Sequence, residues 1–102
     1  MARFVSDFVA WEVAILHMSR RRSFSADPEL WFEKLRDLPG ITMVPATGRI
    51  LMASQMLPGR LHSDPADRVM IATARARDLT LVTRDRAILA YGEAGNVRVL
   101  AC

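Results

Sequence analysis

Three carboxylates in this chain lie within or beside apolar segments, and together they could catalyse a reaction. Asp67 lies in "HSDPADR" (62–68), just ahead of "VMIATA"; Asp85 follows the apolar run "TLVT"; and Glu12 lies within "FVAWEVAIL". Clustered carboxylates repel one another, and a hard cation such as Mg²⁺ or Mn²⁺ is their usual counter-ion. A cation held in this way activates a water molecule for in-line attack on a phosphodiester. Phosphodiester hydrolysis is therefore the chemistry to consider if the three side chains converge.

Two of these acidic segments also have a simpler structural interpretation. Asp64 suits the N-cap of a helix that has Pro65 in its first position and Asp67 in its third. In the same way, Asp85 suits the N-cap of a helix that starts at Arg86. Taken alone, the spacing is more typical of helix starts than of a metal site.

Glu12 is harder to explain as a surface residue. On a helical wheel it shares a face with Phe8, Ile15 and Leu16, so that face is expected to be buried. An ionised carboxylate among apolar side chains is costly unless it is paired, bound to a cation or extended to water from the edge of the face. Both the functional and the edge interpretation stay open at this point.

The elements that position these acids alternate along the chain. Apolar, β-branched runs predict strands, and capping residues with proline–glycine breaks predict helices. The predicted strands cover 3–6, 41–46, 80–84 and 97–101, and the predicted helices 7–21, 26–38, 47–57, 64–77 and 86–94. This order indicates an α/β domain with a parallel sheet. Ligands gather at the carboxyl ends of such strands, so Glu12, Asp67 and Asp85 are expected to converge on one rim.

The composition indicates the class of protein and its cellular location. The 102 residues, 51% hydrophobic and 25% charged, suit one globular domain over 1–102. No apolar run approaches the roughly 20 residues that cross a bilayer, and one cysteine allows no intrachain disulfide, so we expect a cytoplasmic protein. The four methionines at apolar positions are expected to fill the core: Met43, Met52, Met56 and Met70.

Basic residues suit an acidic partner. The net charge is +3, the pI is about 10, and only Lys34 among the 14 basic residues is not arginine. Arg68 and Arg84, near the expected rim, are candidates for holding a substrate backbone. The run "SRRRS" (19–23) is either a solvated helix end or a phosphate-contacting patch.

The order of the motifs resembles a known family. The segments are "FVSDFVAWEVAIL", "LPGITMVPAT", "LPGRLHSDPADRVMIATARARDLTLVTRDRAILAY" and "VRVLA". They resemble the PIN domain of VapC-type toxins, the ribonucleases of type II toxin–antitoxin pairs. The resemblance implies a three-layer α/β/α fold, Mg²⁺ or Mn²⁺ as cofactor, RNA as substrate and an antitoxin protein that blocks the site. It matches Glu12, Asp67 and Asp85 to the family's catalytic, metal-binding acids.

The resemblance also extends to surrounding residues. Asp64 matches a recurrent companion acid, and Thr83, like Arg68 and Arg84, falls at a second-shell or substrate-contacting position. Family members normally begin with a strand that ends in a metal-binding aspartate, ahead of the segment that matches "RFVSD". This chain looks like a truncated member that lacks this central strand and its aspartate. We therefore expect unpaired strand edges, self-association and slow cleavage. A catalytically inactive module that binds an antitoxin or nucleic acid is the alternative.

Overall fold

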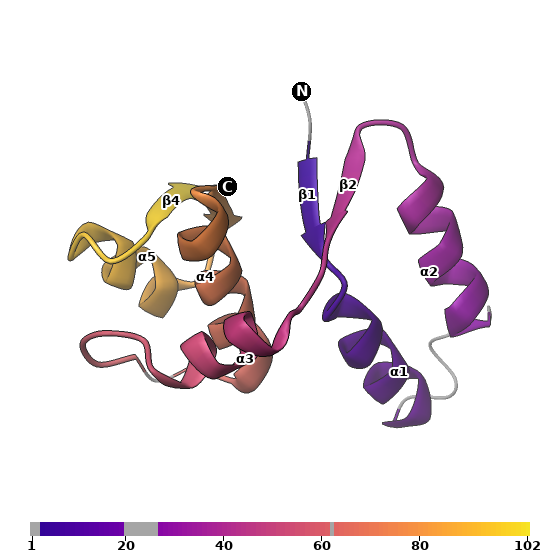
Figure 1. The fold of residues 1–102 in the computed structure, drawn as a ribbon, viewed down its shortest axis with the longest axis horizontal. Coiled ribbons are helices and arrows are strands. Elements are labelled where there is room, and N and C mark those ends of the chain that lie inside the picture. The colour runs from indigo at the N-terminus through magenta and orange to yellow at the C-terminus, as the bar shows by residue number, and fades with distance from the viewer. Residues whose placement is uncertain (1–2, 20–26, 62) are drawn as a thin grey trace. The chain divides into compact units, whose positions relative to one another are not determined.

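The computed structural model describes residues 3–19, 27–61 and 63–102 (Figure 1). The chain divides into two compact units, Met1–Pro45 and Ala46–Cys102. Across the described residues there are five helices and four strands. The arginines of "SRRRS" lie outside the described residues, so neither interpretation of that run is tested.

The N-terminal unit joins two strands to two helices. Its elements are β1 (Arg3–Ser6), α1 (Val9–Ser19), α2 (Pro28–Asp37) and β2 (Ile41–Val44). The strands pair in parallel, with Arg3 opposite Ile41 and Ser6 opposite Val44. The helix α2 begins as its sequence predicts, because the Asp27 side chain accepts a hydrogen bond from the backbone N–H of Glu29 at 3.0 Å.

The C-terminal unit places two strands beside three helices. Its elements are α3 (Gly48–Gln55), α4 (Pro65–Arg77), β3 (Thr80–Thr83), α5 (Arg86–Glu93) and β4 (Arg98–Ala101). β3 and β4 are also parallel, with Thr80 opposite Arg98 and Thr83 opposite Ala101. Only Asp78 and Leu79 separate α4 from β3, and the two elements pack together. The chain therefore reverses between them, and the first turn of α4 lies toward the end at which β3 finishes.

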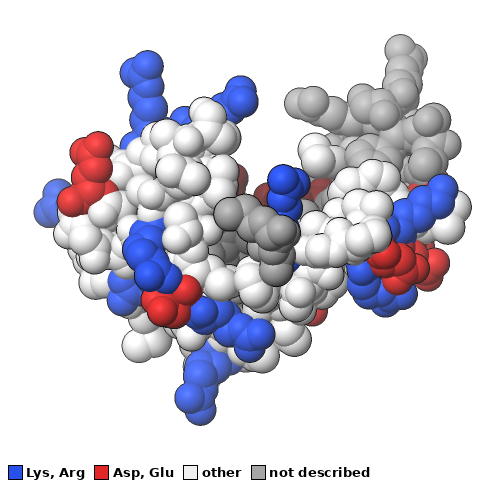
Figure 2. All heavy atoms as spheres, turned by 90° about the horizontal axis from the view of Figure 1, so that it is seen from above, with Lys and Arg blue, Asp and Glu red and all other residues white. Residues whose placement is uncertain are grey.

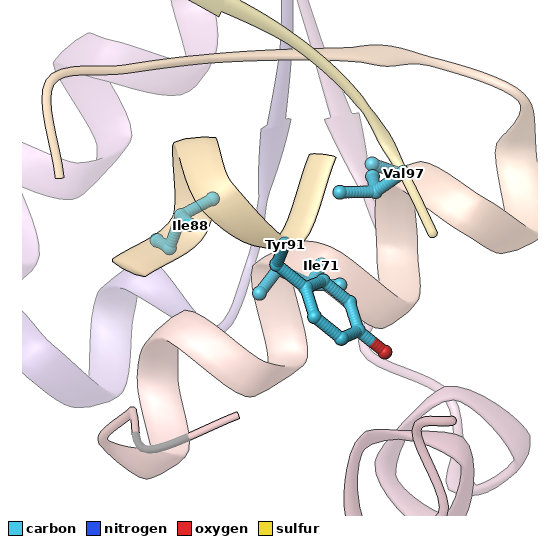
Figure 3. Packing of buried hydrophobic residues seen from close by; sticks show 5 residues of the cluster. Ile71, Ile88, Tyr91 and Val97 are labelled. Carbon is cyan, nitrogen blue, oxygen red and sulfur yellow. The ribbon is translucent and has the colours of Figure 1, made fainter. Parts of the chain in front are cut away.

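A small apolar core holds the C-terminal unit together. Ile71 of α4 is completely buried, and Ile88 and Tyr91 of α5 and Val97 ahead of β4 pack around it (Figure 3). Gly92 lets α5 lie directly on β4, since a Cβ at this position would come within 2.3 Å of a Val99 methyl group. This packing fixes α5, and with it the N-terminal end of that helix, against the rest of the unit.

The predicted strands and their parallel pairing are confirmed. Among the described residues, however, each strand pairs with one other, giving a two-stranded sheet in each unit instead of a single sheet. The three-layer sandwich built on all four strands, and the single domain over 1–102, remain predictions. No helix formed by the described residues is long and apolar enough to cross a membrane.

Two expectations about burial are wrong. The face of α1 that carries Glu12 is not buried, since Ile15 and Leu16 are each more than two-fifths exposed, and the buried residue described in this helix is Val13. In α3 the core-facing residues Ile50 and Ser54 are one turn apart, which leaves Met52 on the opposite side, and Met56 lies beyond the last turn. Both methionines are largely exposed.

Candidate active site

Asp67 is held at the start of α4 by the residues just ahead of it. The Asp64 side chain accepts a hydrogen bond from the backbone N–H of Asp67 at 2.9 Å, and Pro65 occupies the first helical position. The capping interpretation of Asp64 is therefore confirmed. The carboxylate of Asp67 is not used for capping: its Oδ2 accepts a hydrogen bond from the Ser63 hydroxyl at 3.1 Å, and the side chain is half-buried.

The surroundings of Asp67 disfavour its negative charge. Partial burial raises the pKa of the Asp67 carboxyl above its ordinary value, and the neighbouring charges of Asp64 and Asp85 raise it further. The hydrogen bond from Ser63 acts in the opposite direction and lowers that pKa. Two neighbouring carboxylates, Asp64 and Asp85, thus disfavour the negative charge of Asp67, and a bound cation would relieve that repulsion. The carboxylate oxygens of Asp67 and Asp85 are donors of the kind that Mg²⁺ and Mn²⁺ prefer.

Asp85 reaches the same region from the carboxyl end of β3. It directly follows the strand and Arg84, and its Oδ1 accepts a hydrogen bond from the backbone N–H of Ile88 at 3.1 Å, which caps α5. Thr83 fixes this turn, because its hydroxyl accepts a hydrogen bond from the backbone N–H of Asp85 at 3.1 Å. The capping interpretation of Asp85 is confirmed as well, yet its charge still acts on Asp67. The two roles coexist in one side chain.

Glu12 lies in the other unit. It occupies the first turn of α1 and is half-buried. Among the described residues, no group of three His, Cys, Asp or Glu side chains is arranged to hold a metal ion. In the structure the charges of Asp64 and Asp85 both act on Asp67, and the approach of Glu12 to these acids stays a prediction.

The two arginines expected at the rim have different surroundings. The Nε of Arg68 donates to the carbonyl oxygen of Ser54 at 2.8 Å, and its Nη1 donates to that of Leu61 at 3.0 Å. Arg84 is exposed beside Asp85, as is Arg86 on its other side. Figure 2 shows arginine and lysine side chains projecting over much of the displayed face, with fewer acidic ones among them. Exposed arginines next to an acidic site suit a polyanionic ligand.

Sequence reasoning missed Ser63. Its hydroxyl is the side-chain group that contacts the carboxylate of Asp67 in the described part of the chain. The available signal was its place immediately before the capping Asp64 and one helical turn ahead of Asp67. Serine at such a position is ordinary in a helix start, so the spacing alone did not point to it.

A known protein family matches most of the chain. The PIN domain family matches residues 2–94, a stretch that includes Glu12, Asp67 and Asp85 and runs through both units. The chain belongs to the PIN domain family. PIN domains are typically nucleases that bind RNA or DNA, and they generally use divalent metal ions. No curated protein and no solved structure matches the chain.

Proposed function

We propose that this PIN domain protein is a metal-dependent endoribonuclease of the VapC type, the toxin of a toxin–antitoxin pair, and that it acts in the cytoplasm. The observation that supports this most directly is the environment of Asp67. Its carboxyl pKa is raised by burial and by two neighbouring acids, although the helix would be capped without its side chain. A fold keeps such a repulsive group most readily where the group has a ligand to bind.

In this proposal Asp67 and Asp85 would hold Mg²⁺ or Mn²⁺, and Glu12 stays the third acid that the resemblance implies. A bound cation would supply an activated water and neutralise charge on the phosphate. Ser63 fixes one oxygen of the Asp67 carboxylate by its hydrogen bond, and Thr83 fixes the turn that presents Asp85. Both carboxylates would therefore meet a cation in a preset orientation.

RNA is the proposed substrate. Arg84 and Arg86 are exposed on either side of Asp85, where their guanidinium groups can pair with backbone phosphates. Arginine presents planar, bidentate N–H donors that suit phosphate oxygens better than a lysine ammonium does. These two residues would hold the strand across the site while the acids act on one phosphodiester.

The proposed partners are an antitoxin protein and further copies of the chain. Supporting association, Val82 and Leu100 are opposite each other in the β3–β4 register, and both are more than half exposed. Parallel sheets are normally covered on both faces. A two-stranded sheet with an apolar pair left open to water is expected to acquire cover from another polypeptide.

Cleavage of a labelled RNA tests the proposed activity. The wild-type chain should cleave in Mg²⁺ or Mn²⁺ and stop when a chelator is added, and Asp67→Asn should be inactive. Asp78→Asn is the matched control: Asp78 lies at the other end of α4 with positive φ, which asparagine tolerates well. Chelator-resistant cleavage would contradict the metal mechanism. RNA binding without cleavage would instead favour a catalytically inactive PIN module.

A further inference from the structure

The loop between α3 and α4 is fastened on two sides. Arg68, in the first turn of α4, donates through Nε to Ser54 O at the end of α3 and through Nη1 to Leu61 O within the loop. The guanidinium is planar, so two of its N–H groups point at the two carbonyls in a fixed relative direction. From α5, the Tyr91 hydroxyl donates to the carbonyl oxygen of Pro58. Leu61 is thus held to α4, and Pro58 to α5.

The fastened loop leads directly to the hydroxyl that contacts Asp67. Ser63 follows Leu61 by two residues, and its Oγ donates to Asp67 Oδ2 at 3.1 Å. Arg68 is the next residue after Asp67 in the helix. The Arg68 side chain therefore fixes Leu61 beside α4. Asp67, whose carboxylate receives the Ser63 hydrogen bond, is the residue just before Arg68.

We propose that Arg68 is a positioning residue for the Asp67 carboxylate, acting through the loop and the Ser63 hydroxyl. The inference rests on the proposed function, because it assumes that Asp67 holds a cation. With the loop fixed, Ser63 orients Oδ2 and leaves the remaining carboxylate lone pairs directed toward the ligand. Without the hydrogen bond from Ser63, the Asp67 carboxylate is free to rotate. Binding of the cation must then order it again.

The contacts favour this role over phosphate binding. Two N–H donors of the Arg68 guanidinium are committed to backbone carbonyls, and the residue is half-buried. Moving the group onto a phosphate would leave the carbonyl of Ser54 without this donor, and Ser54 is 2% exposed. Arg84, by contrast, is exposed beside Asp85.

A double-mutant cycle on Mn²⁺ affinity tests the inference. Arg68→Lys keeps the positive charge but cannot span both carbonyls, and Ser63→Ala removes the hydroxyl. Each change should weaken Mn²⁺ binding by about 10–100-fold, the usual loss for outer-shell partners. In the Ser63→Ala background, Arg68→Lys should cause almost no further loss, because its effect passes through that hydroxyl. Arg77→Lys, in the exposed last turn of the same helix, is the matched control and should bind Mn²⁺ normally.

Kinetics and a second variant make the test decisive. Arg68→Lys should raise the Mn²⁺ concentration needed for cleavage while leaving the KM for RNA close to wild type. Tyr91→Phe, which frees the loop from its other side, should weaken Mn²⁺ binding by about tenfold, again only when Ser63 is present. Tyr91→Phe provides the same test if Arg68→Lys fails to fold. Additive losses, or a raised KM for RNA with normal Mn²⁺ affinity, would overturn the inference. If the wild-type chain does not bind Mn²⁺ at all, the proposed function itself is wrong.

Discussion

Asp85 caps α5 and its charge acts on Asp67, and substitution by asparagine separates these two roles. Its Oδ1 accepts the backbone N–H of Ile88 at 3.1 Å, a hydrogen bond that an asparagine side-chain oxygen also makes. Asparagine is about as good an N-cap as aspartate, but it carries no negative charge for a cation. Asp85→Asn should therefore keep its stability and lose activity, whereas Asp85→Ala should lose activity and part of its stability.

The expected magnitudes follow from the cap. Replacing an N-cap aspartate by alanine costs about 0.5–2 kcal/mol of unfolding free energy. In a chain of this size each kcal/mol shifts the melting temperature by about 4–8 °C, so Asp85→Ala should melt about 2–16 °C below the wild type. Asp85→Asn should stay within about 0.5 kcal/mol of the wild type. Its cleavage rate should fall by at least a hundredfold, since even outer-shell changes at metal sites cost about 10–100-fold.

The assay pairs thermal melting by circular dichroism with cleavage of one labelled RNA in Mg²⁺. Asp64 provides the matched control, since it caps α4 through the backbone N–H of Asp67 at 2.9 Å. Asp64→Ala should lose stability in the same range, while Asp64→Asn should keep both stability and cleavage. If Asp85→Asn cleaves RNA at the wild-type rate, Asp85 is only a helix cap and does not bind the cation.

Three further predictions concern the fold and its charges. Gly92→Ala should destabilise the chain by about 1–3 kcal/mol in chemical denaturation, because its Cβ would lie 2.3 Å from a Val99 methyl group. Gly48→Ala, which meets nothing within 4 Å, should be neutral or slightly stabilising. The raised pKa of Asp67 means that the folded chain holds this proton more tightly than the unfolded chain, a contribution to stability that is lost as the pH rises through the folded-state pKa. Without metal, Asp67→Asn should therefore melt above the wild type at pH 7, and the difference should shrink on acidification; an unchanged gap would contradict the assignment. Finally, light scattering should show self-association that weakens in Val82→Thr, and a stable monomer would count against the exposed sheet face as an interface.

Local signals in the sequence predicted the helix starts and the strands. Asp64 and Asp85 both cap the helices predicted to start at them, since a cap depends on residues only two or three positions away. The strands were predicted for a similar reason: short β-branched, apolar runs between capped helices leave few other conformations. Parallel pairing then followed from the helical crossovers.

Long-range contacts were not predictable in the same way. Arg68 was expected at a phosphate but contacts Ser54, which lies 14 residues earlier in the chain, and no periodicity encodes that contact. The prediction of burial in α1 was wrong for a similar reason. Ile15 and Leu16 lie on the apolar face of an amphipathic pattern, but whether that face is buried depends on what packs against it. Ser63 was missed because its type and spacing are those of an ordinary helix start.

Direct measurement of Mn²⁺ binding tests the central claim, that Asp67 and Asp85 hold the cation of a PIN nuclease. Titration followed by electron paramagnetic resonance counts the bound ions in the wild-type chain, in Asp67→Asn, in Asp85→Asn and in the control Asp78→Asn. We expect saturable Mn²⁺ binding in the wild type and in Asp78→Asn, and at least hundredfold weaker binding in Asp67→Asn and Asp85→Asn. Equal Mn²⁺ affinity in all four proteins would contradict it.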